Sequence, residues 1–197
     1  MKDNFDVIVN SYINNDIGID INFLSPELSA GLYQNIRQLQ AENMMTPAGI
    51  GNGQIKDADQ QMRSDSIYWM DPSHSNIFEQ EFLQLAQQFT DHLNENCYTG
   101  INSFEFHYAV YGEGNSYKKH RDSFKNDKSR KYSLVSYLNK DWLEEDGGQL
   151  WIHQENTIQK ILPEAQTAVF FKSDETEHEV TNANRERMSI TGWLKQV

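Results

Sequence analysis

The sequence contains a single cysteine, Cys97, among its 197 residues. An internal disulfide needs two cysteines, and the common zinc and iron–sulfur sites use several cysteine thiolates. Both are therefore excluded. A metal ion bound by this chain would have to use histidine and carboxylate side chains.

Long apolar runs are also missing, since no segment approaches the roughly 20 apolar residues that a membrane-spanning helix needs. The first ten residues, MKDNFDVIVN, have neither the basic start nor the continuous apolar stretch of a secretory signal. We therefore expect no membrane partner and a cytoplasmic location. The chain length suits one well-buried core, and we expect a single domain over residues 1–197.

Basic residues are scarce, with 17 Lys and Arg against 29 Asp and Glu and a net charge of −12. Nucleic-acid phosphates are bound by clustered cations, so no nucleic-acid partner is predicted. The one basic segment is YKKHRDSFKNDKSRKY, from Tyr117 to Tyr132. Such charge runs are usually solvated loops. The functional alternative is attraction of an anionic co-substrate or of an acidic protein segment.

Apolar periodicity predicts helices with one strand insertion in the first hundred residues. FDVIVNSYINND indicates a short helix, and IGIDINFL a half-buried strand in which Ile17, Ile19 and Ile21 alternate with polar partners. Ser25 before Pro26 is typical of a helix start. Two helical stripes then follow, formed by Leu28, Leu32, Ile36 and Leu39, and by Phe78, Phe82, Leu85, Ala86, Phe89 and Leu93.

Between these helices, a glycine-containing polar tract predicts a mobile loop near 45–65, followed by a strand in SIYWM. From residue 103 onward the pattern changes to short β-rich runs separated by turn signals. Strands are predicted near 103–111, 132–138, 148–153, 157–161, 167–171, 177–181 and 187–194. We therefore expect an α+β protein with a mainly β core, in which residues 1–100 support a jelly roll formed by residues 101–197.

A possible metal motif lies inside the basic segment. His120 and Asp122, two residues apart, project from the same face of an extended chain. The triplet alone decides nothing, because roughly 0.4 such triplets are expected by chance in a chain of this composition. His178 opens a predicted strand after an acidic loop, and a jelly roll could bring it beside the pair. Two imidazoles and one carboxylate form the facial triad of non-haem Fe(II) oxygenases, which leaves positions open for a bidentate co-substrate and O2.

Oxygenase chemistry of this kind also requires a group that binds the co-substrate, and Arg187 is the candidate. If the co-substrate is 2-oxoglutarate, its distal carboxylate needs a fixed cation, best supplied by a guanidinium. Arg187 lies nine residues after His178 and shares strand parity with Ser189, Thr191 and Trp193, whereas Met188, Ile190 and Leu194 point into the core. Arg185 is the rival cation, but it is expected in the preceding turn.

Several motifs together resemble a known family. HRD, then YLNKDW followed by GG, then FFKSD, HEV and an arginine nine residues after the histidine are similar to the oxygen-sensing prolyl hydroxylases. These enzymes are a branch of the prolyl 4-hydroxylase-like 2-oxoglutarate/Fe(II) dioxygenases. LSPELSAGLYQNIRQL, the glycine-containing loop and MRSDSIYWM resemble that family's N-terminal helix, mobile loop and strand. The likeness implies a double-stranded β-helix with N-terminal helices packed on one sheet.

The resemblance also implies roles for single residues. His120, Asp122 and His178 would bind Fe(II), and Arg187 would hold 2-oxoglutarate with help from the hydroxyl of Tyr137. Further co-substrate contacts would come from Tyr111, Thr191, Trp193 and Leu150, and the substrate side would be shaped by Arg63, Asp65 and Trp69. The turn after Tyr111 and the loop before His178 are each one residue shorter than the family pattern.

Several of these residues also have a purely structural interpretation. Tyr137 and Trp193 could be ordinary strand aromatics, and Arg63 with Asp65 a surface ion pair. The remaining histidines, His74, His92 and His153, are interpreted as surface residues, and His107 as a packed strand residue whose parity with Tyr111 allows it to face the site.

The resemblance implies a 2-oxoglutarate- and Fe(II)-dependent dioxygenase that hydroxylates a prolyl residue of a protein at C4 and releases succinate and CO2. Ascorbate is the candidate reductant, and a translation GTPase is the candidate protein substrate. Two alternatives stay open. One is an oxygenase acting on another side chain or a small molecule. The other is a non-catalytic metal-binding interaction domain, although such a domain needs no carboxylate anchor such as Arg187.

Overall fold

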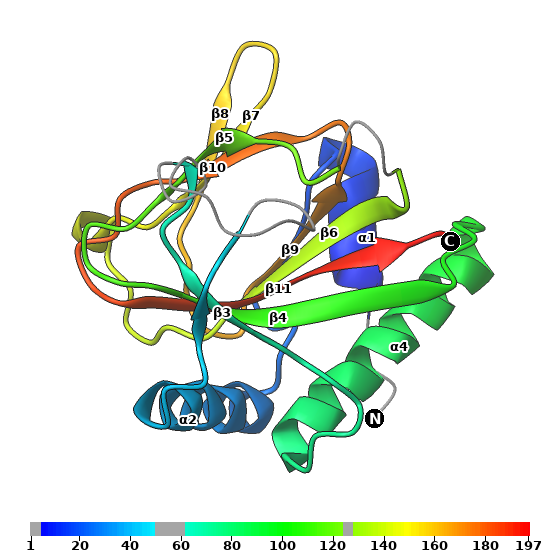
Figure 1. Cartoon of the computed structure of the whole chain (residues 1–197). Coiled ribbons are helices and arrows are strands. Elements are labelled where there is room, and N and C mark those ends of the chain that lie inside the picture. Colours follow the sequence, from blue (N-terminus) through cyan, green and yellow to red (C-terminus); the bar gives the residue numbers. More distant parts are fainter. Residues whose placement is uncertain (1–4, 50–61, 124–127) are drawn as a thin grey trace.

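Two antiparallel β-sheets and a layer of helices make up the computed structural model, which describes residues 5–49, 62–123 and 128–197 (Figure 1). The larger sheet has the strand order β1-β9-β6-β11-β4-β3-β2, and the smaller sheet the order β5-β10-β7-β8. This arrangement confirms the predicted jelly roll with helices on one sheet.

The larger sheet contains β1 (Gly18–Asp20), β2 (Thr46–Pro47), β3 (Ser66–Trp69), β4 (Ser103–Tyr111), β6 (Arg130–Tyr137), β9 (Ala168–Lys172) and β11 (Arg187–Lys195). The smaller sheet contains β5 (Tyr117–His120), β7 (Leu150–His153), β8 (Ile158–Ile161) and β10 (Glu177–Val180). A short 3-10 turn, η1 (Glu144–Asp146), precedes β7. All seven strands predicted after residue 103 are confirmed.

The helices are α1 (Asp6–Asn15), α2 (Pro26–Ala41) and α4 (Ile77–Cys97). As predicted, Ser25 caps α2, because its side chain accepts a hydrogen bond from the backbone N of Leu28 at 3.1 Å. Asn76 caps α4 in the same way. None of the helices in the described residues combines the length and apolarity that crossing a membrane requires.

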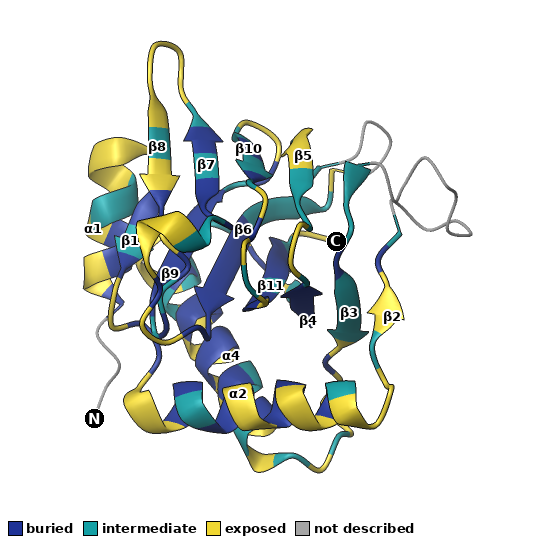
Figure 2. Cartoon of the chain, turned by 90° about the vertical axis from the view of Figure 1, so that its left-hand side faces the viewer, coloured by how far each residue is buried: buried dark blue, intermediate teal, exposed yellow. Residues whose placement is uncertain are grey.

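Two apolar cores lie on opposite faces of the larger sheet. The helices pack on one face, where α2 and α4 run beneath the strands (Figure 2), and Met188, Ile190 and Leu194 of β11 join their core. On the other face, residues of both sheets form a second core that includes Tyr137, Leu150 and Val180. The predicted alternation of β11 is thereby confirmed, and it places Arg187 on the side of the second core.

Two local predictions need correction, and a third falls mostly outside the described residues. The basic segment does not begin as a solvated loop, because Tyr117–His120 forms β5, although Lys118 and Lys119 are exposed. The strand predicted from Ile17 is only three residues long, and Ile21 is exposed rather than half-buried. Most of the loop expected near 45–65 falls on residues 50–61, outside the described residues, and its flanks form β2 and the start of β3.

Candidate functional site

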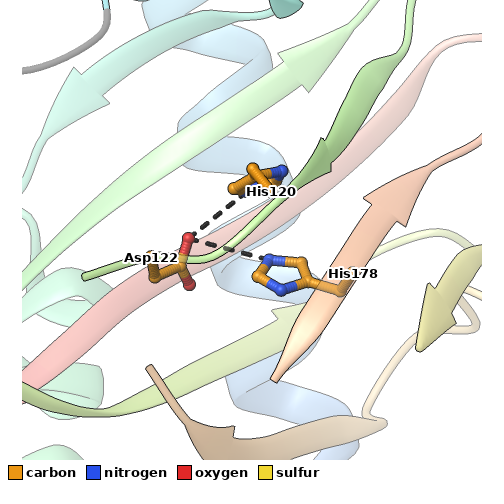
Figure 3. Close-up of side chains that lie close together, drawn as sticks. All are labelled: His120, Asp122 and His178. Carbon is orange, nitrogen blue, oxygen red and sulfur yellow. Dashed lines mark ion pairs between the residues drawn. The ribbon is translucent and has the colours of Figure 1, made fainter. Parts of the chain in front are cut away.

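His120, Asp122 and His178 meet between the two sheets (Figure 3). His120 ends β5, Asp122 follows it by two residues, and His178 lies opposite His120 in the β5–β10 register. Oδ1 of Asp122 is 3.3 Å from Nε2 of His120 and 3.6 Å from Nε2 of His178. Asp122 and His178 are buried, and His120 is half-buried. The topology therefore brings together the three residues that the sequence analysis selected.

Backbone carbonyls fix the orientation of both imidazoles. The Nδ1 atoms of His120 and His178 lie 2.7 Å and 3.1 Å from the carbonyl oxygens of Lys118 and Thr176. A carbonyl only accepts, so each Nδ1–H donates, and each Nε2 faces Asp122 as the ring atom available to a metal. This is the arrangement in which imidazoles bind metals.

The charge state of the triad suits a cation. Burial alone would raise the pKa of Asp122, but His178, His120 and the Ser133 hydroxyl hold it well below its usual range. Burial lowers the pKa of His178, which favours the neutral imidazole. Two imidazoles and one carboxylate, with their ligand atoms within 4.8 Å of one another, form a donor set that fits Fe(II).

A cavity opens beside the triad. It is lined by residues of both sheets, namely Arg63, His107, Ala109, Tyr111, Tyr117, Val135, Leu150, Val180, Arg187, Thr191 and Trp193, together with His120, Asp122 and His178. Five of the six residues predicted to contact a co-substrate are in this set. The sixth, Tyr137, is fully buried in the core of the same face.

Arg187 is a buried cation, 1% exposed, for which no ion pair is found in the described part of the chain. Its Nε donates to the carbonyl oxygen of Gly148 at 2.8 Å and its Nη1 to Oγ of Ser189 at 3.3 Å. Nη2 has no hydrogen-bond partner among the described residues. Because a buried guanidinium without a counter-charge is costly, this position fits an anionic ligand.

A second buried polar group near Arg187 also lacks a hydrogen-bond partner in the described residues. It is the hydroxyl of Tyr137. The guanidinium carbon of Arg187 lies 5.1 Å from the Tyr137 ring centroid and 5.0 Å from that of Tyr111. Burial raises the pKa of Tyr137 to about 12, so its hydroxyl remains protonated and can donate. Two unused donors, one of them cationic, are what a carboxylate accepts.

Arg185, the rival cation, lies in the turn before β11 as expected and pairs with Asp146 at 3.1 Å. The interpretation of Arg63 and Asp65 as a surface ion pair is wrong, because their side chains are 10% and 0% exposed. Arg63 lines the cavity, whereas Asp65 lies behind it, outside the lining residues. Trp69 is exposed beside the cavity, with its ring 4.8 Å from that of His107.

Several residues at the site were assigned no role by the sequence analysis, among them Ala109 and Val180 in the cavity lining. Tyr117 and Val135 line the cavity, and Ser133 and Arg130 hydrogen-bond to Asp122. The only signal for Val135 is strand parity, because it lies two residues before Tyr137 and therefore on the same face of β6.

Burial of His107 confirms its interpretation as a packed strand residue, whereas His74 and His153 are less exposed than expected. His107 is fully buried in the cavity wall, and neither of its ring nitrogens has a partner among the described residues. His74 and His153 are partly buried, with Glu79 and Glu179 as their partners.

Comparison with known proteins places this geometry in a family. Residues 106–195 match the model of the 2OG-Fe(II) oxygenase superfamily. A prolyl-4-hydroxylase from Pseudomonas putida is 31% identical, with 96% of this chain and 97% of that chain covered and a TM-score of 0.87.

Two further solved structures share the fold. One is a prolyl hydroxylase from Trichoplax adhaerens in complex with a hypoxia inducible factor peptide fragment, with 24% identity, 97% and 88% coverage and a TM-score of 0.86. The other is a viral collagen prolyl hydroxylase from Paramecium Bursaria Chlorella virus-1 in its 2OG complex, with 19% identity, 94% and 98% coverage and a TM-score of 0.67. The fold, the His-Asp-His triad and the full-length similarity to the bacterial enzyme show that this chain is a dioxygenase of the 2OG-Fe(II) oxygenase superfamily, in its prolyl 4-hydroxylase-like branch.

Proposed function

We propose that this protein hydroxylates a prolyl residue of a protein substrate at C4, converting 2-oxoglutarate and O2 to succinate and CO2. The observation that carries the proposal is the buried Nη2 of Arg187, which has no hydrogen-bond partner among the described residues and lies at the same cavity as the His-Asp-His triad. A non-catalytic interaction domain has no use for that buried cation. The 31% identical prolyl-4-hydroxylase supports the prolyl substrate.

The cofactor-binding residues follow from the donor groups. His120, Asp122 and His178 would hold Fe(II), and Arg187 with Tyr137 would hold the C5 carboxylate of 2-oxoglutarate. Bound together, the iron, the 2-oxoacid and O2 supply the oxidising power that replaces a C–H bond by C–OH. Tyr111, Thr191, Trp193 and Leu150 complete the co-substrate pocket in this proposal, and ascorbate would serve as reductant.

The cavity walls contribute binding, orientation and exclusion of water. Val135 from the larger sheet and Leu150 and Val180 from the smaller sheet contribute apolar surface to the cavity lining. Because Arg187 is buried in the same lining, the co-substrate carboxylate would be held in a low-dielectric site, where its attraction to the guanidinium is strong.

A protein substrate fits the outer part of the site. Arg63 and the exposed Trp69 lie where a peptide would approach the triad, and Asp65 would act on the substrate through Arg63. A peptide complex of a prolyl hydroxylase of this fold supports a peptide ligand. A translation GTPase in the cytoplasm is the partner that we propose.

The proposal can be tested with the anaerobic protein, Fe(II) and 2-oxoglutarate. We expect a weak visible charge-transfer band, and succinate once air is admitted. His178→Ala should abolish the band. Arg187→Gln should raise the 2-oxoglutarate concentration needed for it at least tenfold, since a charged hydrogen bond is lost. Arg185→Gln, which removes the neighbouring cation outside the cavity, is the matched control. Absence of both band and succinate in the wild type would refute the oxygenase mechanism.

The substrate class needs a second experiment. Proteomes of cells with and without the enzyme would be compared by mass spectrometry for prolyl peptides that gain one oxygen. A hydroxylated prolyl peptide that appears with the wild type and not with His178→Ala supports the proposal. Oxidation of a different side chain, or turnover of a small molecule alone, would contradict it.

A further inference from the structure

Tyr117 lies flat against the proposed metal ligand His120. The two ring centroids are 3.5 Å apart, and the ring planes differ by 14°. Tyr117 also contacts the guanidinium of Arg63, whose carbon lies 4.7 Å from the Tyr117 centroid. The tyrosine is therefore in contact with a metal-ligand candidate and with a buried cation.

Asp65 fixes that cation. Nε and Nη2 of Arg63 donate to the two carboxylate oxygens of Asp65 at 2.7 Å and 2.5 Å, which is a bidentate pair. Burial alone would lower the pKa of Arg63, but Asp65 raises it well above its usual range, so the guanidinium stays charged. Because Asp65 compensates this charge, Arg63 adds no net positive charge next to a site that must accept a metal cation.

The backbone connects the same residues. Arg63 and Tyr117 form an isolated antiparallel bridge. Next to it, the backbone N of Ser64 donates to the carbonyl oxygen of Ser116 at 3.2 Å, and the backbone N of Ser116 donates to Oγ of Ser64 at 3.1 Å. Asn115 adds a bond from Nδ2 to the carbonyl oxygen of Ser64 at 2.6 Å. The segment before β3 is thus attached to the segment that leads into His120.

This support matters because His120 is the least anchored of the three proposed ligands. β5 is an edge strand, and its register with β10 consists of two residue pairs with an irregularity between them. By contrast, His178 lies on β10, which is paired on both sides, and the carboxylate of Asp122 is held by Ser133. The Lys118 carbonyl that orients Nδ1 of His120 belongs to this same short edge strand, so a contact from outside the strand adds restraint to the position of the ring.

We propose that Tyr117, held by the Arg63–Asp65 pair, is a positioning residue that fixes the imidazole of His120 in the orientation required for metal binding. Arg63 and Asp65 then act on the metal site as well as on the substrate side. The inference rests on the proposed role of the triad as the metal site. Substitutions behind a metal ligand typically weaken metal affinity about 10- to 100-fold, which sets the size of the expected effect.

The test is a titration of the metal-free protein with Co(II), followed by the visible bands of the bound ion. Tyr117→Leu should raise the Co(II) dissociation constant about tenfold, and Tyr117→Phe, which keeps the ring, should restore it to within about twofold of wild type. Asp65→Asn keeps the shape of the side chain but removes the charge, and should also weaken binding. Tyr132→Leu deletes a comparable aromatic ring from the helix-side core of β6. It should lower stability without changing Co(II) affinity.

The outcomes separate this inference from the proposed function. If the wild type binds Co(II) through the triad, but folded Tyr117→Leu and Asp65→Asn bind it equally well, the positioning role is wrong and the proposed metal site stands. If neither the wild type nor His178→Ala binds Co(II), the proposed metal site itself is refuted. Should Tyr117→Leu fail to fold, the Co(II) affinity of Asp65→Asn is compared with that of wild type. Equal affinities would then refute the positioning role.

Discussion

Ser133 donates a hydrogen bond from Oγ to Oδ2 of Asp122 at 2.6 Å, while Oδ1 of the same carboxylate faces the two imidazoles. The hydroxyl thereby fixes which oxygen is presented to the metal site. Both side chains are buried, so water cannot replace the bond without a rearrangement.

Ser133→Ala should therefore weaken metal binding by about tenfold, because the carboxylate loses the group that orients it. Ser136→Ala is the matched control, since Ser136 lies on the same strand and its buried hydroxyl has no partner in the described residues. Co(II) titration of both variants measures the difference. Equal affinities would show that the Ser133 hydroxyl does not orient Asp122.

Tyr137→Phe should have opposite effects on stability and on co-substrate binding. The metal-free protein should be as stable as wild type or more stable, because a buried hydroxyl without a partner in the described chain is removed. The KM for 2-oxoglutarate should rise about tenfold, equal to roughly 1.4 kcal/mol, through loss of one hydrogen bond. Thermal unfolding and a succinate assay measure the two effects. An unchanged KM would remove Tyr137 from the carboxylate site.

His107 should give the metal-free protein a pH-dependent stability. Burial, with smaller contributions from Arg63 and Arg130, lowers its pKa from 6.5 to about 3. At pH 7 the imidazole is neutral in both states. Between pH 6.5 and 3 the unfolded chain binds the proton and the folded chain does not, so the free energy of unfolding falls as pH falls. The slope from this group is about 1.4 kcal/mol per pH unit.

Chemical denaturation at pH 7, 6 and 5 checks this slope. His107→Phe should reduce it, whereas His92→Gln, a substitution of a partly exposed histidine on α4, should retain it. A wild-type slope in His107→Phe would mean that His107 is accessible to protons in the folded protein.

Gly31→Ala should lower the free energy of unfolding by about 1–3 kcal/mol through overpacking. A Cβ at this position of α2 would lie 2.3 Å from ring atoms of Phe78 on α4. Gly112→Ala is the control, because its Cβ would come no closer than 3.4 Å to Nδ2 of Asn115. Urea unfolding of both variants measures the contrast, and an unaffected Gly31→Ala would show that Phe78 can move aside.

Local sequence patterns were sufficient for most of the secondary structure. The helical spacing of Leu28, Leu32 and Ile36 reflects burial on one helix face, and the alternation of β11 reflects burial on two different faces. Sequence patterns did not predict a strand whose side chains are incompletely buried. β5 was missed because Lys118 and Lys119 are exposed, so its four residues carry no apolar alternation.

Only part of the candidate site could be predicted from the sequence. The triad and Arg187 were found because their chemistry demands particular residue types. Ser133 and Tyr117 were not, because a serine in a strand and a tyrosine before the metal motif carry no signal of their own. Their importance depends on contacts with Asp122 and His120 that exist only once the strands are paired.

The sequence by itself determined which ligand types are available, since one cysteine leaves histidine and carboxylate, and it determined which residues alternate on each strand. Only the tertiary structure decided that Arg63 and Asp65 are a buried pair and that Nη2 of the buried Arg187 has no hydrogen-bond partner in the described chain. The physical reason is that burial and pairing depend on residues far apart in the chain. A sequence pattern fixes the face of a strand but not what packs against that face.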